Sequence, residues 1–364
     1  MLNIVCRYLM FLPLFSCLSI FATEVHHLDE SLVPVESRAN NVRAQAIVQA
    51  FKNVVLKNTG TQRALTAPEI TKQLGNASAM MTQYGYQEID GKLFIKVSFD
   101  HQRVIRLLRQ AGLPVWGKQR PLTLLWIVEQ TGGERVILND MSTSAVHNAF
   151  DIQSADRGVP LLFPLMDLDD AMLVGVNDIR GQFVDNVAGA SLRYQADFFI
   201  IGTISFEADR FNYQISLYPS TLKSGGSQTT PLAYKEGHSG SIEHAVKAMT
   251  TVISEYYAAQ YGVVDSGESL NVQVSFTDLN DMSQLVQLER YLKQLSAIKV
   301  VNIAEIKGDT VTFNLSLFGH KEDLFRLFAL DPRMSPVSKE ATLPASQFEE
   351  TEQKEPARIY YWKG

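Results

Sequence analysis

Two nearly continuous apolar runs in the middle of the chain constrain the fold most. The segments Leu122–Gln130 (LTLLWIVEQ) and Asp197–Phe206 (DFFIIGTISF) carry apolar side chains at both odd and even positions. A strand with this pattern is covered on both faces, as in the sheet of an α/β domain. We therefore expect a central three-layer α/β domain with a mixed sheet over residues 117–265.

Shorter patterns predict the remaining elements of this domain. Residues 142–154 and 178–194 have helical spacing, and residues 242–261 predict a long closing helix. The apolar segment Val159–Leu165 indicates another buried strand. Residues 211–219 alternate between apolar and polar, so we expect them to pair antiparallel with the strand that precedes them.

The regions on either side of this domain share a pattern. Glu88–Phe99 (EIDGKLFIKVSF) and Glu305–Leu317 (EIKGDTVTFNLSL) each combine a glycine-containing turn with an alternating strand, and an amphipathic helix follows each of them. A further helix is expected over Asn41–Gly60. These patterns predict small α+β modules over residues 23–116 and 266–332, so the whole chain combines α/β and α+β classes.

The N-terminus has the features of a secretory leader. Residues 1–22 contain one charge, Arg7, before the apolar run Tyr8–Phe21, and the small residue Ala22 follows. This order predicts a signal peptide that is cleaved after Ala22. The run is shorter than the roughly 20 residues of a membrane-spanning helix, so no transmembrane span is expected after the leader is removed.

The positions of the cysteines exclude cysteine chemistry from the predicted mature chain. The two cysteines, Cys6 and Cys17, both lie in the predicted leader. The mature chain would therefore have no disulfide, thiol nucleophile or cysteine-bound metal. An alternative interpretation makes Cys17 the acylated residue of a lipoprotein, although the bulky Phe15 fits that signal poorly.

Composition and motifs exclude several function classes. Hydrophobic residues make up 46% of the chain and charged residues 20%, with a net charge of −6, which gives no indication of a nucleic-acid partner. The nucleotide-binding patterns GxxxxGK and GxGxxG and the zinc pattern HExxH do not occur. No cofactor is therefore expected.

Four aspartates form the strongest candidate site. Asp167, Asp169, Asp170 and Asp178 follow the apolar segment at 159–165. A calcium loop would need glycine where Met172 stands, so that motif fails. Aspartates also cap helix starts, which is the interpretation we favour. Because α/β domains bind ligands where their strands end, all four remain candidates for a ligand or metal, and no catalytic residue is assigned.

Two other motifs give weaker signals. The sequence Gly237–Ser241 (GHSGS) departs from the nucleophile pattern GxSxG, and Ser241 is better explained as a helix N-cap. Arg103, Arg106 and Arg109 lie on one face of a predicted helix. We interpret them as a solvated face, with an anion site as the alternative.

The last part of the chain loses periodicity. Residues 333–364 are polar, contain prolines and mix both charges, so we expect a disordered tail. The sequence ends in IYYWKG, which is aromatic. This end would be loose or lie against its own domain, and the alternative is a peptide that docks on a partner.

Several short motifs resemble those of one bacterial family. VRAQAIVQAFKNVVLKNTG, QRPLTLLW, RGVPLLFPL and ADFFIIGTISF, which lie between Val33 and Gly262, are similar to the family called domain of unknown function 2066. Its members are secreted proteins of Gram-negative bacteria. The resemblance implies a periplasmic location in the Gram-negative envelope and no assigned activity or catalytic residues.

The leading hypothesis is a non-enzymatic periplasmic protein. It would act as an adaptor or accessory factor in cell-envelope assembly or maintenance and would bind an unidentified protein partner in the envelope. One alternative is a periplasmic hydrolase or metal-dependent enzyme that uses the region Asp167–Asp178. Another is a small-ligand binding protein.

Overall fold

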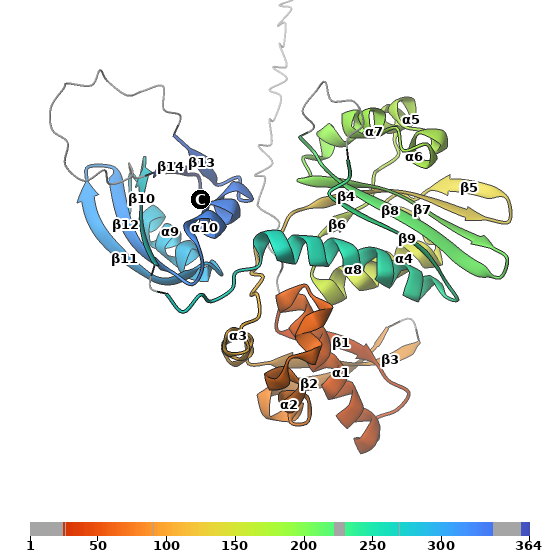
Figure 1. Cartoon of the computed structure of the whole chain (residues 1–364), viewed down its shortest axis with the longest axis horizontal. Helices are drawn as coiled ribbons and strands as arrows, with labels where there is room; N and C mark the ends of the chain where they lie inside the picture. Colours follow the sequence, from red (N-terminus) through yellow and green to blue (C-terminus); the bar gives the residue numbers. More distant parts are fainter. Residues whose placement is uncertain (1–24, 26, 90, 222–229, 269, 338–357) are drawn as a thin grey trace, which may run out of the picture.

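The computed structural model describes every residue except 1–24, 26, 90, 222–229, 269 and 338–357. The predicted signal peptide and Cys17 lie outside the described residues. The chain forms three sheets, each packed against its own helices (Figure 1). The prediction of mixed α/β and α+β architecture is confirmed.

The N-terminal module packs helices on one face of a three-stranded antiparallel sheet. The sheet has the order β1-β3-β2. The predicted hairpin turns at Gly91, whose φ of 72° suits glycine. Phe51, Ile95 and Phe99 are fully or almost fully buried between the layers. The elements are β1 (Glu30–Pro34), α1 (Asn40–Thr59), α2 (Pro68–Leu74), β2 (Met81–Ile89), β3 (Lys92–Phe99) and α3 (His101–Gln110).

The central domain has helices on both faces of a mixed sheet. Strands β4 and β7 are parallel, whereas β5, β8 and β9 pair antiparallel with their neighbours, in the order β5-β4-β7-β8-β9. The predicted antiparallel pairing of residues 211–219 is confirmed. The strands are β4 (Thr123–Thr131), β5 (Glu134–Ile137), β6 (Leu161–Leu162), β7 (Phe198–Glu207), β8 (Arg210–Pro219) and β9 (Ala233–Ser239).

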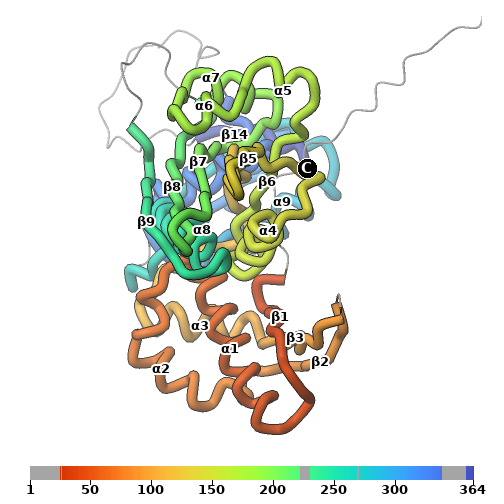
Figure 2. Tube along the Cα trace, turned by 90° about the vertical axis from the view of Figure 1, so that its right-hand side faces the viewer, coloured from red at the N-terminus to blue at the C-terminus, as the bar shows by residue number. Residues whose placement is uncertain are grey.

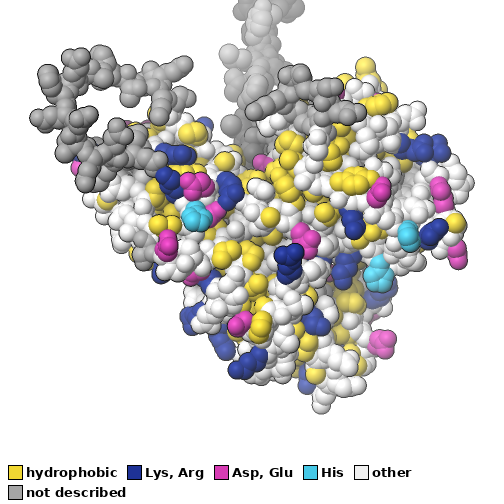
Figure 3. All heavy atoms as spheres, viewed as in Figure 1, with side chains coloured by type: hydrophobic (Ala, Val, Ile, Leu, Met, Phe, Trp, Pro, Cys, Tyr) yellow, Lys and Arg dark blue, Asp and Glu magenta, His cyan; other side chains and the backbone are white. Residues whose placement is uncertain are grey.

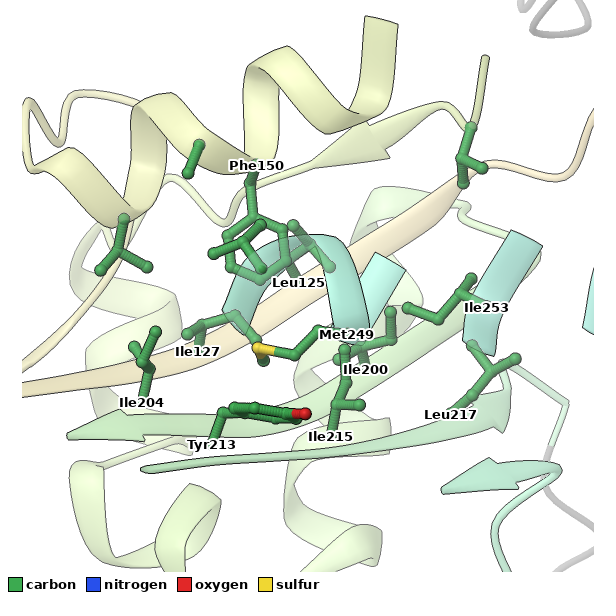
Figure 4. Packing of buried hydrophobic residues seen from close by; sticks show 14 of the residues in the cluster. Leu125, Ile127, Phe150, Ile200, Ile204, Tyr213, Ile215, Leu217, Met249 and Ile253 are labelled. Atoms are coloured by element: carbon green, nitrogen blue, oxygen red, sulfur yellow. The ribbon is translucent and has the colours of Figure 1, made fainter. Parts of the chain in front are cut away.

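Two helical layers enclose this sheet (Figures 1 and 2). Helices α4 (Ala145–Arg157) and α8 (Ile242–Tyr261) cover one face, where Leu125, Phe150 and Met249 meet in a hydrophobic core (Figure 4). The other face is covered by three short helices, α5 (Leu168–Leu173), α6 (Val176–Arg180) and α7 (Val184–Ser191).

Two elements of the central domain differ from expectation. The predicted strand at 159–165 is reduced to the two residues of β6, because Pro160 and Pro164 on either side lack the N–H that a ladder needs. The predicted helix at 178–194 is divided into α6 and α7. Gly181 ends the first helix, and Gln182 adopts a left-handed φ of 56° that interrupts the helical backbone.

The C-terminal module has a five-stranded sheet of order β11-β12-β10-β14-β13. Helices α9 and α10 pack on one face of it (Figure 1). The elements are β10 (Leu270–Thr277), α9 (Met282–Gln294), β11 (Ile298–Lys307), β12 (Thr310–Leu317), α10 (Lys321–Ala329), β13 (Met334–Pro336) and β14 (Arg358–Trp362).

Strand β14 corrects the prediction of a disordered tail over residues 333–364. It inserts between β10 and β13, parallel to β10. Tyr360 and Trp362 are 7% and 6% exposed and complete the hydrophobic core of this module. Residues 338–357 lie outside the described residues. The polar composition of most of residues 333–364 led to the prediction of disorder, whereas the aromatic residues at the end form a strand whose burial stabilises the sheet.

A buried arginine joins the N-terminal module to the central domain. Arg120 is 2% exposed, and its guanidinium lies 3.8 Å from the centre of the Trp116 ring. Its N–H groups donate to the backbone oxygens of Lys57, Trp116, Gly117, Arg157 and Gly158. Several of these oxygens lie at the C-terminal ends of α1 and α4, where the helix dipole favours a cation. Burial nevertheless lowers the pKa of Arg120 to about 9.

A second arginine joins the N-terminal and C-terminal modules. The guanidinium of Arg109 lies 3.4 Å from the centre of the Phe318 ring and donates to the Ser296 oxygen at 2.8 Å. Arg103 donates to the Ala79 oxygen within its own module. The prediction of a solvated arginine face is therefore wrong for Arg109, which contributes to an intramolecular interface.

Candidate functional site

Helix α5 is inverted relative to an ordinary surface helix. Its buried residue is a carboxylate, Asp170, which is 0% exposed. Its apolar side chains Leu168, Met172 and Leu173 are 75%, 76% and 53% exposed. A helix on a globular domain normally turns its apolar face to the core and its charges to water. This reversal marks α5 as the most unusual surface of the central domain.

Three donors satisfy the buried carboxylate of Asp170. It accepts hydrogen bonds from the Met166 N–H at 3.0 Å, from Arg193 Nη1 at 3.2 Å and from the Tyr194 hydroxyl. The Tyr194 oxygen in turn accepts from the Leu165 N–H at 2.8 Å. Burial, together with the bond to this carboxylate, raises the pKa of Tyr194 to about 12. The buried charge is thus compensated by a cation and hydrogen bonds, as a stable structure requires.

Asp167 fixes the start of α5. It is the N-cap, and its Oδ1 accepts from the Asp170 N–H at 3.1 Å. Arg193 Nη1 and Nη2 also donate to Oδ1 and Oδ2 of Asp167, each at 2.7 Å. Mainly because of the hydrogen bonds from Arg193, the pKa of Asp167 falls to about 2. Asp169 is 80% exposed in its side chain and lies 4.0 Å from Arg193.

Asp178 belongs to a separate cap. It is the third residue of α6 and accepts from the Gly175 N–H and from Asn186 Nδ2, both at 2.8 Å. The Gly175 hydrogen bond is the main reason that the pKa of Asp178 is lowered. The structure therefore brings Asp167, Asp169 and Asp170 together around Arg193, and Asp178 shares none of their partners.

This arrangement has the chemistry of a structural network. The oxygens of Asp167 and Asp170 point at N–H and O–H donors, so they shape the N-terminal end of α5. Within the described ranges, no group of three or more histidine, cysteine, aspartate or glutamate side chains could hold a metal ion. The interpretation of Asp167 as a helix cap is confirmed by its geometry.

We group the exposed apolar residues on α5 and on the segments bonded to its neighbourhood under the name α5 surface. Two of these residues lie outside α5 and the segment before it. Leu192 precedes Arg193, which binds Asp167 and Asp170 of the helix start. Met141 follows Asp140, whose N–H donates to the Pro164 backbone oxygen at 3.1 Å. Apolar side chains reach the exterior above the central sheet, over α5–α7 (Figure 3). The α5 surface comprises Met141 (81% exposed), Leu165 (51%), Leu168, Met172, Leu173 and Leu192 (65%).

The residues of the α5 surface were not recognised from the sequence. The sequence predicts a buried strand over residues 159–165, which includes Leu165, and makes no prediction for Leu168, Met172 or Leu173. No local signal identifies them, because Leu168 and Met172 stand four positions apart, which is the spacing of an ordinary core-facing stripe.

The serine motif at 237–241 has a structural role. Ser239 ends strand β9, and Ser241 is the N-cap of α8, where its Oγ accepts from the His244 N–H at 3.3 Å. The predicted cap is confirmed. A serine that accepts a backbone N–H at a helix start stabilises that start.

Comparisons with known proteins place both ends of the chain in families. Residues 22–117 match the family described as domain of unknown function (DUF8605), and residues 270–359 match DUF2066. The suspected DUF2066 family is therefore confirmed, but its match lies in the C-terminal module rather than between Val33 and Gly262, where the quoted motifs occur. No curated protein matches the chain.

One solved structure is similar to part of the chain, the LpoB C-terminal domain from Salmonella enterica. The two are 14% identical, the alignment covers 38% of this chain and 95% of that domain, and the TM-score is 0.20. Among the described residues, no helix is both long and apolar enough to cross a membrane. The DUF2066 match, over residues 270–359, thus corresponds to the C-terminal module.

Proposed function

We propose that this protein is a non-enzymatic adaptor or accessory factor of the Gram-negative cell envelope and that it binds a protein partner through the α5 surface. The observation that carries the proposal is the inversion of α5, which exposes Leu168 and Met172 while Asp170 is buried. Keeping apolar side chains in water forgoes the stabilisation of burial, and contiguous exposed apolar patches mark interaction sites.

The composition of the α5 surface favours a protein as its ligand. Four leucines and two methionines, all more than half exposed, present an apolar face that suits the apolar side chains of a protein. Methionine is flexible and polarisable, so it adapts to the contours of a partner. Interfaces of this kind have an apolar centre and a polar rim.

The rim indicates the charge of the partner. Asp140 and Asp169 are exposed beside the apolar residues, whereas Arg193 is occupied by Asp167 and Asp170. These two aspartates, which stand next to Met141 and Leu168 in the sequence, place negative charge beside the apolar residues. The complementary partner is an apolar segment flanked by lysine or arginine, because matching charges steer the encounter and fix its orientation.

The α5 surface is fixed before a partner arrives. Arg193 bridges Asp167 at the helix start to Asp170 in its first turn, so the six residues of α5 are held by tertiary contacts. A helix this short has little stability of its own. A preorganised surface avoids part of the ordering cost of binding.

The periplasmic location rests on the sequence. The predicted leader of residues 1–22 and the family resemblance support it. A fusion of residues 1–30 to a reporter that is active only outside the cytoplasm tests it directly. Reporter activity that is lost when Arg7 and the apolar run are deleted is the expected result, and an inactive fusion would contradict export.

In-cell photo-crosslinking tests the docking proposal. A photoreactive amino acid at position 168 or 172 of the full chain should give one reproducible crosslinked protein. The matched control is position 282, because Met282 is 71% exposed on α9 in another module. Mass spectrometry of the products identifies the partner. Crosslinks that are equal at 172 and 282, or absent at 168 and 172, would overturn the proposal.

A further inference from the structure

The face of the central sheet that carries α5–α7 changes character along its length. Phe199, Ile201 and Tyr218 pack beneath these short helices. Further along the same strands, side chains on this face become polar and line an open depression of about 350 Å³. That volume lies within the range of small-ligand sites, about 300–1,000 Å³.

The register of the strands arranges the polar side chains as a grid. Residues directly opposite one another on β7, β8 and β9 share a face, which gives two rows of three. The rows are Thr203–Gln214–Glu236 and Ser205–Asn212–His238. All six residues line the depression. We call this arrangement the polar grid.

Four of the six grid side chains leave their hydrogen-bonding capacity unused. Within the described part of the chain, the side chains of Thr203, Ser205, Asn212 and Gln214 make no hydrogen bond to another protein group. Hydroxyl and amide groups each supply donors and acceptors. Four such groups, partly buried and aimed into one depression, form a recognition surface for a ligand that also offers both donors and acceptors.

We propose that the polar grid binds a neutral oligosaccharide that runs across the strands. The grid is nearly neutral, with one glutamate and one histidine beside four uncharged groups, so it matches a ligand with many hydroxyl groups and few charges. Neighbouring strands lie about 4.8 Å apart, which is comparable to the length of one sugar ring, so successive strands can address successive sugars. The depression is open to solvent, so a chain can lie across it.

An aromatic side chain extends the grid at the sheet edge. Tyr234 on β9 is 45% exposed, and its hydroxyl donates to Glu236. This bond orients the Glu236 carboxylate within its row, and the tyrosine ring provides a flat apolar face against which the carbon face of a sugar can stack. This site is independent of the α5 surface and adds a second kind of ligand to the proposed adaptor.

Titration of the full chain with two defined sugars tests the proposal. The probes are chitotetraose, which carries acetamido groups, and cellotetraose, which carries hydroxyl groups alone. We expect at least one of them to bind with a dissociation constant in the millimolar range by calorimetry. The double variant Asn212→Ala/Gln214→Ala should weaken this binding at least tenfold while its unfolding temperature is unchanged.

The control uses the same residue types on a different open sheet. Asn271 and Gln273 are exposed on β10, so Asn271→Ala/Gln273→Ala should bind like the unaltered chain. Binding that the grid variant alone loses supports the site. The proposal is overturned if neither sugar binds, if the control variant loses binding equally, or if the grid variant binds normally.

Discussion

The two helical layers of the central domain are held against the sheet by different kinds of contact. Helices α4 and α8, of 13 and 20 residues, bury Phe150, Met249 and Ile253 almost completely. Helices α5, α6 and α7 have 6, 5 and 8 residues, and α5 exposes its leucines and methionine. The first layer is held by apolar burial and the second, at α5, by a carboxylate–guanidinium network. A surface that is held by polar contacts can leave its apolar side chains available for a partner.

The largest expected effect is on the α4–α8 layer. Phe150→Ala removes a fully buried ring and leaves a cavity, so the free energy of unfolding should fall by about 3–5 kcal/mol. Urea unfolding followed by circular dichroism measures the change. A loss similar to that of Met172→Ala would show that the two layers do not differ as described.

A smaller effect is expected from the network that holds α5. Arg193→Leu leaves the buried Asp170 carboxylate without its cation and removes the hydrogen bonds from Arg193 to Asp167. The free energy of unfolding should therefore fall, but by less than for Phe150→Ala, since Arg193 is partly exposed. Arg193→Lys keeps the charge but cannot donate to both Asp167 oxygens. Its free energy of unfolding should therefore lie between those of the unaltered chain and Arg193→Leu. Arg210→Leu, at an exposed arginine on β8, is the matched control in urea unfolding.

Acid should separate the two layers without any mutation. The pKa of Asp167 is about 2 in the folded chain, below its value in an unfolded chain, so its contribution is present above about pH 4 and is lost as the pH falls towards 2. Burial raises the pKa of Asp156 in α4. Protonation of this carboxyl as the pH falls therefore does not destabilise the folded chain, in contrast to protonation of Asp167.

Methionine methyl resonances report this difference between the layers. We expect the signals of Met166 and Met172 beside α5 to shift or broaden between pH 4 and pH 2. Met249, a fully buried residue of α8, serves as the internal control and should keep its native shift over that interval. Simultaneous loss of all three signals would indicate that the layers unfold as one unit.

The smallest stability effect is expected on the α5 surface itself. Leu168→Ala and Met172→Ala remove side chains that are already in water, so the free energy of unfolding should change by no more than about 0.5 kcal/mol. The same variants should lose the partner that is captured by crosslinking from position 165. A large drop in stability would mean that these residues support the fold rather than a partner.

The sequence determined most of the architecture because its signals are local. Continuous apolar runs gave β4 and β7, helical spacing gave α1 and α8, and glycine turns gave the two terminal hairpins. Each of these depends on periodicity or on a turn residue within one short segment. Two predictions were wrong because they depend on more than local pattern. Gln182 interrupts a predicted helix with a left-handed backbone conformation that composition does not reveal. Tyr360 and Trp362 are buried in a strand although they follow a polar stretch.

Only the tertiary structure decided that Asp170 is buried in an ion-pair network and which apolar residues remain exposed. Asp170 is buried because Arg193 and Tyr194, more than twenty positions away, return to the same corner. Six grid residues share a depression because of the register of three strands. Such placements depend on contacts between distant segments, and pattern alone does not encode which distant side chain satisfies a buried charge.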